Sequence, residues 1–254
     1  AMQKHKKRLG QHFLHDKNII NKIIKNLKTS TKDTFIEIGP GEGALTTPLL
    51  EGVESIILIE KDRDLIPILE KKYNHKKVKI VNQDILKCEL SNLIKKNTRI
   101  VGNLPYNIST EIIFKLLPFS KDIKDLHFML QKEVVDRIVA APGTKIYGRL
   151  SVMTQVYFTV KKLFDISPNV FTPKPKVDSA YIRLIPKDYI FDSLMHEQKF
   201  RGIVNTVFSA RRKMIKTSLK GVIDSQLLQK LLIEPSSRPE VLSVQNYIDI
   251  SKNV

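Results

Sequence analysis

The sequence is short of several features that would point to particular classes of protein. Cys88 is its single cysteine, which excludes an internal disulfide and argues against a metal centre built on cysteines. No apolar run approaches the roughly 18 residues that span a bilayer. The basic residues near the N-terminus are not followed by the apolar stretch of a secretory signal. We therefore expect a cytoplasmic protein that does not span a membrane and that uses no metal.

Acidic residues are also scarce relative to basic ones. The 254 residues include 43 Lys and Arg but 26 Asp and Glu, which gives a formal net charge of +17. Because 42% of the residues are hydrophobic, enough for a folded core, this charge does not indicate disorder. It indicates a polyanionic partner, either nucleic acid or an acidic membrane surface, without choosing between the two.

Short apolar runs alternate with helical patterns through most of the chain. This alternation predicts a mostly parallel sheet with helices on both faces. The last two strands are joined by a loop that is too short for a helical crossover, so we expect that pair to be antiparallel. The predicted strands are Thr34–Ile38, Ser55–Glu60, Val78–Asn82, Arg99–Gly102, Leu126–Leu130, Val160–Ile166 and Val177–Ile185.

The pattern changes near Pro186, beyond which only helical periodicities follow. At about 150 residues per domain, the length suits one large domain and one small one. We therefore predict a catalytic domain over residues 1–186, with a basic N-terminal arm, and a small helical domain over residues 187–254. The helices predicted in this tail are Phe200–Phe208, Arg212–Lys220, Ser225–Leu232 and Val244–Ile250.

Three glycines, Gly39, Gly41 and Gly43, follow the first predicted strand. Glycines there let the backbone turn sharply and approach a ligand closely. Glu60 ends the second strand 21 residues after Gly39, where a carboxylate can accept hydrogen bonds from both hydroxyls of a ribose. Glu37, just before the glycines, and Glu42, between the last two of them, would repel a phosphate. The pattern therefore favours an adenosyl ligand without phosphate, S-adenosylmethionine, over a dinucleotide.

Polar motifs also follow the third and fourth predicted strands. Asp84 can accept a hydrogen bond from the adenine amine of the cofactor. The side-chain oxygen of Asn103 and the carbonyl of Leu104 could accept the two hydrogens of an exocyclic base amine. Those bonds would draw the amine toward a tetrahedral geometry, with its lone pair aimed at a methyl group. Pro105 stiffens this turn, and Tyr106 offers a ring on which a flipped base can stack.

Basic residues gather in three other segments: the N-terminal arm, the loop that begins near Phe171, and residues 199–223. The loop that begins near Phe171 combines an aromatic ring, which could cover the opposite face of the base, with two lysines. Residues 199–223 hold seven Lys and Arg and no acid. Such patches make contacts with phosphates that position a nucleic acid without specifying its sequence. The predicted RNA-binding residues are Lys7, Arg8, Lys174, Lys176, Arg211, Arg212 and Lys213.

Taken in order, these motifs resemble those of the KsgA-type small-subunit ribosomal RNA adenine dimethyltransferases, and the resemblance covers nearly the whole chain. It implies a Rossmann-like class I methyltransferase fold, with a mostly parallel seven-stranded sheet whose last strand is antiparallel, and a small all-helical C-terminal domain. The matching segments are residues 7–14, 37–43, 103–106, 147–152, 171–179, 211–213 and 238–243.

The resemblance also implies a reaction: transfer of methyl groups from S-adenosylmethionine to N6 of two adjacent adenosines near the 3′ end of 16S rRNA. The implied partner is that RNA, within the small ribosomal subunit or an assembly intermediate, and we expect a monomer. Asn103, Tyr106 and Phe171 fall where the family holds the target adenine. The family's cofactor contacts fall on His12, Leu14, Gly39, Glu60, Asp84 and Asn103, and Gly41 joins them as part of the glycine loop.

Two positions depart from the family pattern. His12 stands where many members have Asn, which leaves open whether its side chain or its backbone contacts the cofactor. Lys174 interrupts a run of prolines that is usual in the Phe171 loop.

Other functions use parts of the same pattern. The nearest is the related antibiotic-resistance methyltransferase, which modifies one adenine in large-subunit RNA, although Leu104 and residues 238–243 favour the small-subunit family. A DNA adenine methyltransferase would need a target-recognition segment, which this sequence lacks. A non-catalytic assembly factor would not need the intact Asn103–Tyr106 motif. The glycine spacing disfavours a dehydrogenase.

Overall fold

The computed structural model describes residues 11–74 and 77–254. The predicted RNA contacts Lys7 and Arg8 lie outside the described residues. The chain forms two compact units: the first runs to Val135 and resumes over Lys161–Pro186, and the second comprises Asp136–Val160 and Lys187–Val254. The first unit therefore ends at Pro186, and the second resumes at Lys187, which is where the sequence predicts the domain boundary. Residues 136–160 were predicted to belong to the first domain, but their contacts place them in the second unit with Lys187–Val254.

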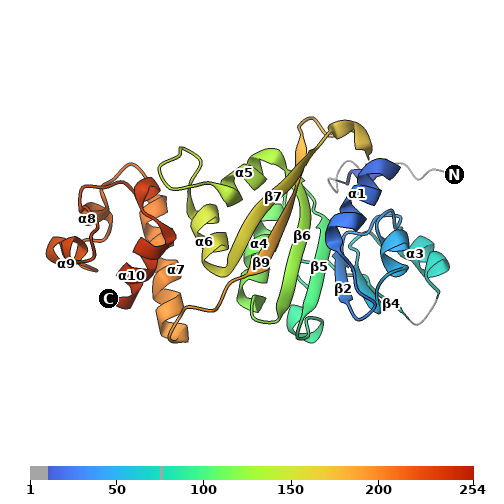
Figure 1. Ribbon diagram of the computed structural model, residues 1–254, viewed down its shortest axis with the longest axis horizontal. Coiled ribbons are helices and arrows are strands. Elements are labelled where there is room, and N and C mark those ends of the chain that lie inside the picture. The colour runs from blue at the N-terminus through green and yellow to red at the C-terminus, as the bar shows by residue number, and fades with distance from the viewer. Residues whose placement is uncertain (1–10, 75–76) are drawn as a thin grey trace. The chain divides into compact units, whose positions relative to one another are not determined.

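The first unit is built on a seven-stranded sheet (Figure 1), in the order β4-β3-β2-β5-β6-β9-β7. The pairs β2–β3, β2–β5, β3–β4 and β5–β6 are parallel, and β9 runs antiparallel to β6. The predicted mostly parallel sheet is thus confirmed. The strands are β2 Thr34–Ile38, β3 Ser55–Ile59, β4 Val78–Val81, β5 Thr98–Asn103, β6 Ile123–Gln131, β7 Phe158–Ile166 and β9 Ser179–Pro186.

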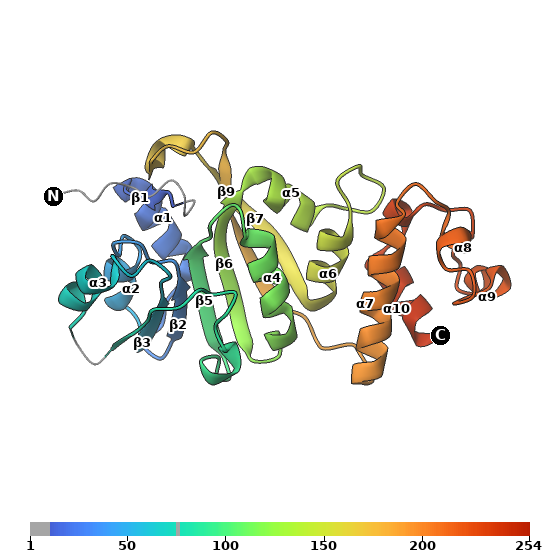
Figure 2. The same cartoon turned by 180° about the vertical axis from the view of Figure 1, so that it is seen from behind.

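Helices cover both faces of this sheet. Helix α1 (Lys17–Leu27) lies in front of it in Figure 1, and α4 (Ser109–Leu116) lies in front when the molecule is seen from behind in Figure 2. The side chain of Asp16 caps α1 by accepting a hydrogen bond from the Ile19 N–H. The remaining elements of this unit are α2 Thr46–Leu50, α3 Ile66–Lys72, the start of α5 Lys132–Val139, and the 3-10 turns Leu90–Asn92, Leu117–Phe119 and Pro168–Val170.

A separate two-stranded sheet joins the N-terminal motif to the loop that follows β7. Strand β1 (Phe13–Leu14) pairs antiparallel with β8 (Phe171–Thr172), with Leu14 opposite Phe171. Both of these side chains are buried in the core beside the apolar face of α1. The pairing holds the segment before α1 against the loop, which positions both at the same end of the large sheet.

The second unit is mainly helical, as predicted for the tail. Hydrogen bonds bring residues 136–160 to it: the Tyr147 hydroxyl donates to the Leu242 carbonyl at 2.7 Å, and the Tyr157 hydroxyl donates to Glu197 at 2.6 Å. Among the described helices, none has the length and apolar character to cross a membrane. The elements are α6 Arg149–Tyr157, α7 Leu194–Ser209, α8 Ile215–Ser218, α9 Ser225–Lys230, the 3-10 turn Pro239–Val241 and α10 Val244–Lys252.

Candidate active site

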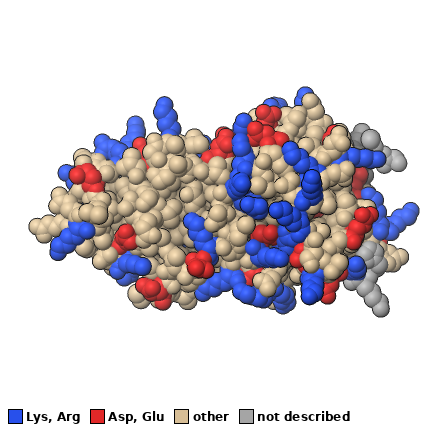
Figure 3. Space-filling view, in the orientation of Figure 1, with Lys and Arg blue, Asp and Glu red and all other residues tan. Residues whose placement is uncertain are grey.

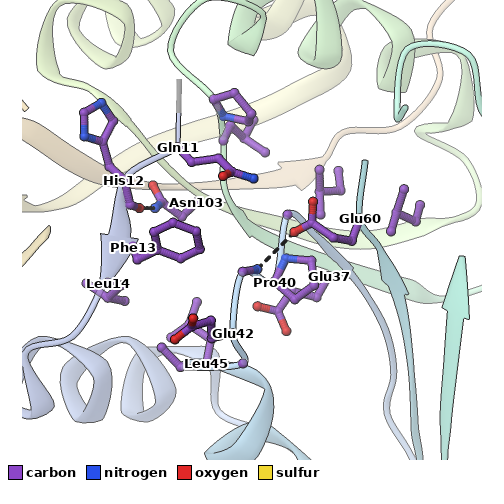
Figure 4. Close-up of a pocket in the computed structure, with 18 of the residues that line it drawn as sticks. Gln11, His12, Phe13, Leu14, Glu37, Pro40, Glu42, Leu45, Glu60 and Asn103 are labelled. Atoms are coloured by element: carbon purple, nitrogen blue, oxygen red, sulfur yellow. Dashed lines mark hydrogen bonds between the residues drawn. The ribbon is translucent and has the colours of Figure 1, made fainter. Parts of the chain in front are cut away.

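A pocket of about 700 Å³ lies beyond the carboxyl ends of β2, β3 and β5, where α/β sheets of this kind bind ligands (Figure 4). It contains most of the residues that the sequence analysis assigned to the cofactor and to the target base. Those that line it are His12, Leu14, Gly39, Gly41, Glu60, Asp84, Asn103, Leu104, Pro105 and Tyr106.

The glycine loop after β2 lies against the N-terminal motif. Gly41 has a φ of +59°, and a Cβ atom built there would come within 2.9 Å of the Phe13 ring. Gly43 has a φ of +98°, and a Cβ atom there would lie 1.9 Å from the Tyr73 hydroxyl oxygen. Left-handed backbone and lack of space both call for glycine at these two positions. The loop therefore brings bare backbone to the wall of the pocket.

Two buried carboxyl groups flank this loop. Glu60, at the end of β3, accepts hydrogen bonds from the backbone N–H groups of Gly41 at 3.2 Å and Asp62 at 2.9 Å. Glu37, within β2, accepts one from the Thr46 hydroxyl at 2.5 Å. Burial raises the pKa of each carboxyl to about 7, against the lowering effect of these hydrogen bonds. The site thus holds two acids that gain or lose a proton near neutral pH.

The segment after β4 supports the same corner of the pocket. The Asn82 side-chain amide donates to the Glu60 carbonyl at 2.9 Å and fixes the backbone on which that carboxylate stands. Asp84 accepts from the Leu86 N–H at 3.0 Å, and its other carboxylate oxygen lies 3.5 Å from the Lys61 ammonium. Asp84 is therefore held by its own turn at the rim.

The Asn103 side chain has a fixed orientation. Its amide nitrogen donates a hydrogen bond to the backbone carbonyl of His12 at 2.8 Å, drawn in Figure 4. The amide oxygen is consequently the atom turned away from His12. Asn103 ends β5, and the parallel strand β2 carries the glycine loop beside it. The acceptor that the sequence analysis required thus stands next to the predicted cofactor loop.

The His12 ring faces Tyr106. The two rings stack with centroids 5.2 Å apart and an interplanar angle of 27°. His12 Nδ1 also lies 2.6 Å from the Pro173 carbonyl oxygen, so the ring links Tyr106 to the loop after β8. The Tyr106 hydroxyl is 2.5 Å from the hydroxyl of the buried Ser179. One face of the Tyr106 ring is therefore covered by the His12 ring, and its hydroxyl is held by Ser179.

Phe171 is not brought into the pocket with the other site residues. Its side chain is 2% exposed and packs in the core beneath α1, while its neighbour Thr172 lines the pocket. Lys174 and Lys176 are exposed in the same loop. The role of Phe171 as the second face of a base sandwich stays a prediction that would require its ring to leave the core.

The basic group in the second unit is exposed except for Arg211. Arg212 and Lys213 are exposed, whereas the Arg211 guanidinium lies 3.3 Å from Glu240 and donates to the Lys145 carbonyl at 2.6 Å. Arg211 is thus partly engaged inside its own unit.

Three residues that shape the site were not assigned a role from the sequence: Phe13, Asn82 and Ser179. Phe13 and Ser179 lie in matching segments and Asn82 ends a predicted strand. The part of each depends on a distant contact, with Gly41 for Phe13, Tyr106 for Ser179 and Glu60 for Asn82. Among the described residues no group of three or more His, Cys, Asp or Glu is arranged to hold a metal ion.

Known proteins are similar to this chain in sequence and in fold. The sequence profile described as ribosomal RNA adenine dimethylase matches residues 2–254. The ribosomal RNA small subunit methyltransferase A of Saccharophagus degradans is 45% identical over 258 residues, which cover 100% of this chain and 96% of the relative. The same-named protein of Alcanivorax borkumensis is 43% identical, covering 98% and 91%. A dimethyladenosine transferase from Plasmodium falciparum superimposes with a TM-score of 0.82 at 25% identity, covering 94% and 96%.

Proposed function

Because the chain belongs to the ribosomal RNA adenine dimethylase family, we propose that it methylates N6 of two adjacent adenosines near the 3′ end of 16S rRNA, with S-adenosylmethionine as methyl donor. The observation that carries this proposal is the Asn103 amide, which is held by His12 with its oxygen turned away from that contact. An exocyclic amine needs such an acceptor before its nitrogen can act as a nucleophile.

The residues present fit an adenosyl cofactor. The glycine loop brings backbone without side chains to the pocket, packed at Gly41 against the Phe13 ring, and Glu60 stands beside it at the end of β3. A carboxylate there suits the two hydroxyls of a ribose, and Asp84 suits an adenine amine. Leu14 and the Phe13 ring supply apolar surface on the opposite side. Glu42, an exposed acid within the loop that also lines the pocket, disfavours a phosphate there.

The chemistry supplied by the bound cofactor is an electrophilic methyl group on a sulfonium centre. The chain's own residues prepare the nucleophile. The Asn103 oxygen accepts one hydrogen of the adenine amine and the Leu104 carbonyl accepts the other, which orients the nitrogen lone pair. Tyr106 stacks on the base with the face that His12 leaves open. The amine proton becomes acidic only after the methyl has been attached, so the reaction needs no strong general base.

We further propose where the RNA and the protein meet. The exposed Lys174 and Lys176 extend from the loop beside the pocket, and Arg212 and Lys213 are exposed in the helical unit. Their contacts would be to phosphates, and Arg211 would have to exchange Glu240 for RNA. The substrate would be 16S rRNA in the small subunit or an assembly intermediate, the enzyme a monomer, and the location the cytoplasm.

The product of the reaction tests this proposal. The protein is incubated with labelled S-adenosylmethionine and small subunits that lack the modification, the RNA is digested, and the labelled nucleoside is identified and mapped. We expect N6,N6-dimethyladenosine at two adjacent positions near the 3′ end of 16S rRNA. Label in large-subunit RNA, supplied in parallel, would instead indicate the related resistance activity, and absence of label from both would overturn the proposal.

A further inference from the structure

We infer that the sheet surface formed by β6, β7 and β9, beside α1, is a second RNA-binding surface. It binds the phosphate backbone of the substrate RNA at a part that is distant from the target nucleotide. This inference rests on the proposed function. We call the surface the basic face and define it by Lys22, Lys124, Lys162 and Arg183. The predicted RNA contacts include none of these residues.

Side-chain contacts and positions along the strands place Lys22, Lys162 and Arg183 on one face, and Lys124, at an irregularity of β6, reaches the Asp33 carboxylate beside it. The Lys22 ammonium lies 4.2 Å from the centre of the Phe164 ring, and that ring packs on Tyr181 with centroids 4.9 Å apart. Arg183 lies two residues beyond Tyr181 on β9, so both project from the same side of the strand. Lys162 stands two residues before Phe164 on β7 and shares its side.

The two carboxylates beneath this face, Asp33 and Asp125, are bound by a buried arginine. Arg99 is buried and bonds Asp33 at 2.8 Å and both oxygens of Asp125 at 2.8 and 3.0 Å. Burial alone would raise the pKa of Asp125, but hydrogen bonds with His127 and Arg99 hold it at about 2. Arg99 therefore offsets one of these two negative charges, and Lys124, 3.7 Å from Asp33, faces the remainder.

The cations of the basic face are correspondingly short of partners. Among the described residues neither Arg183 nor Lys22 makes an ion pair, and the Lys22 ammonium lies over the Phe164 ring. Lys124 is 54% exposed and lies 3.7 Å from Asp33, which Arg99 already holds. Lys162 pairs with Asp165 at 3.1 Å, an acid that it shares with Lys132. An excess of cations over exposed acids on one face favours a polyanion.

The shape of this face suits an extended phosphate chain. Figure 3 shows Lys and Arg side chains gathered over β7 and α1, on the side where Figure 1 has β7 and β9 in front. Strand β6 has nine residues and so runs for about 30 Å. Lys124 lies at the start of β6. Lys132 follows its last residue, at the end of the sheet where Asn103 ends β5. The basic face thus extends from the end of the strands that is opposite the pocket toward the pocket.

A matched pair of variants tests the inference. Lys22→Gln/Lys124→Gln/Arg183→Gln removes three charges from the basic face, and Lys71→Gln/Lys79→Gln/Lys95→Gln removes three exposed lysines elsewhere in the first unit. Binding to unmodified small subunits is measured against salt concentration. Each lost phosphate contact lowers the slope of log affinity against log salt by about 0.7–0.9, so we expect a fall of about 2 for the first variant and little change for the second.

Further measurements separate this inference from its alternatives. We expect the basic-face variant to keep the wild-type single-turnover rate at saturating RNA, the wild-type thermal midpoint and cofactor affinity, and Lys22→Arg/Lys124→Arg/Arg183→Lys to restore binding. An unchanged slope, or an equal loss in both Gln variants, would overturn the inference even if wild-type protein methylates 16S rRNA. So would loss of binding to vesicles of anionic phospholipid with RNA binding intact. Failure of the wild type to methylate would instead count against the proposed function.

Discussion

The side-chain nitrogen of Asn103 donates a hydrogen bond to the backbone carbonyl oxygen of His12, across 2.8 Å and between residues 91 positions apart in the chain. An amide has one donor end and one acceptor end, so using the donor fixes where the acceptor points. The identity of the side chain at position 12 does not enter this bond, because His12 contributes its backbone. A histidine in place of the family's usual asparagine therefore leaves the orientation of Asn103 unaffected.

Replacing Asn103 by aspartate tests this orientation. Asn103→Asp keeps an oxygen to accept from the base amine but sets a carboxylate against the His12 carbonyl, so the side chain should turn away. We expect methylation in a single turnover to fall by about 100-fold or more, as for loss of one preorganised contact in a transition state. Cofactor affinity, measured by calorimetry, should change only a few-fold. Near-wild-type turnover would show that the amide donor does not matter.

Tyr106 offers a second, separable prediction. Tyr106→Phe keeps the ring but loses the contact with Ser179, whereas Tyr106→Ala loses the surface on which the base stacks. Because stacking on an aromatic side chain contributes about 1–3 kcal/mol per base, the alanine variant should weaken productive RNA binding by roughly tenfold or more. The phenylalanine variant should stay close to wild type. Fluorescence of 2-aminopurine at the target position reports the stacking directly, and equal effects of both changes would argue against it.

Gly43 should be intolerant of substitution. In Gly43→Ala the new Cβ would meet the Tyr73 hydroxyl at 1.9 Å, at a φ of +98° that side chains rarely adopt. We expect a loss of about 2 kcal/mol or more in stability, a fall in the thermal midpoint of about 4–8 °C. Gly202→Ala is the control: a Cβ there would meet no atom within 4 Å, within helix α7, and alanine should stabilise that helix slightly. Similar midpoints for the two variants would contradict the steric argument.

Glu37 should make stability depend on pH. Burial raises its pKa to about 7 from an ordinary 4.5. Between these values the folded protein holds a proton that the unfolded chain has released, so this group's contribution to the free energy of unfolding decreases as pH rises. One such group contributes at most about 1.4 kcal/mol per pH unit. The variant Glu37→Gln cannot titrate and should show a flatter profile.

Urea unfolding at several pH values from 5 to 8 measures that difference. The exposed Glu42 is the matched control, because Glu42→Gln removes an acid from the same loop without removing a buried carboxyl. Its profile should follow the wild type. If Glu37→Gln and wild type keep the same slope between pH 5 and 7, the carboxyl at position 37 ionises in the folded protein at its ordinary pKa.

The parts of this molecule that were predictable are those specified by short stretches of sequence. Apolar runs bounded by charges and turn residues located the strands of the large sheet to within a few residues. The glycine loop and Asn103 could be placed beside one pocket because each follows a strand, and parallel strands end at one edge of the sheet. Local pattern and position on the sheet were sufficient there.

Contacts between distant residues were not predictable in the same way. A strand of two residues such as Phe13–Leu14 has no periodicity to detect, and its partner lies at Phe171–Thr172. An aromatic residue in a loop motif gives no sign of whether its ring faces a pocket or the core, and Phe171 faces the core. Residues 136–160 likewise join the second unit through long-range bonds such as that of Tyr147 to Leu242.

The pairing of β1 with β8 has a consequence for how the protein is made. A chain leaves the ribosome from its N-terminus, so Phe13 is free of the exit tunnel long before Thr172, its partner, has been synthesised. Until then neither the two-stranded sheet nor the contact of His12 with Pro173 can form. Contacts of such long sequence separation form late and slowly. The pocket is consequently one of the last parts of the first unit to be completed during translation, and a nascent chain that ends before β8 holds its glycine loop without the closure that orients His12.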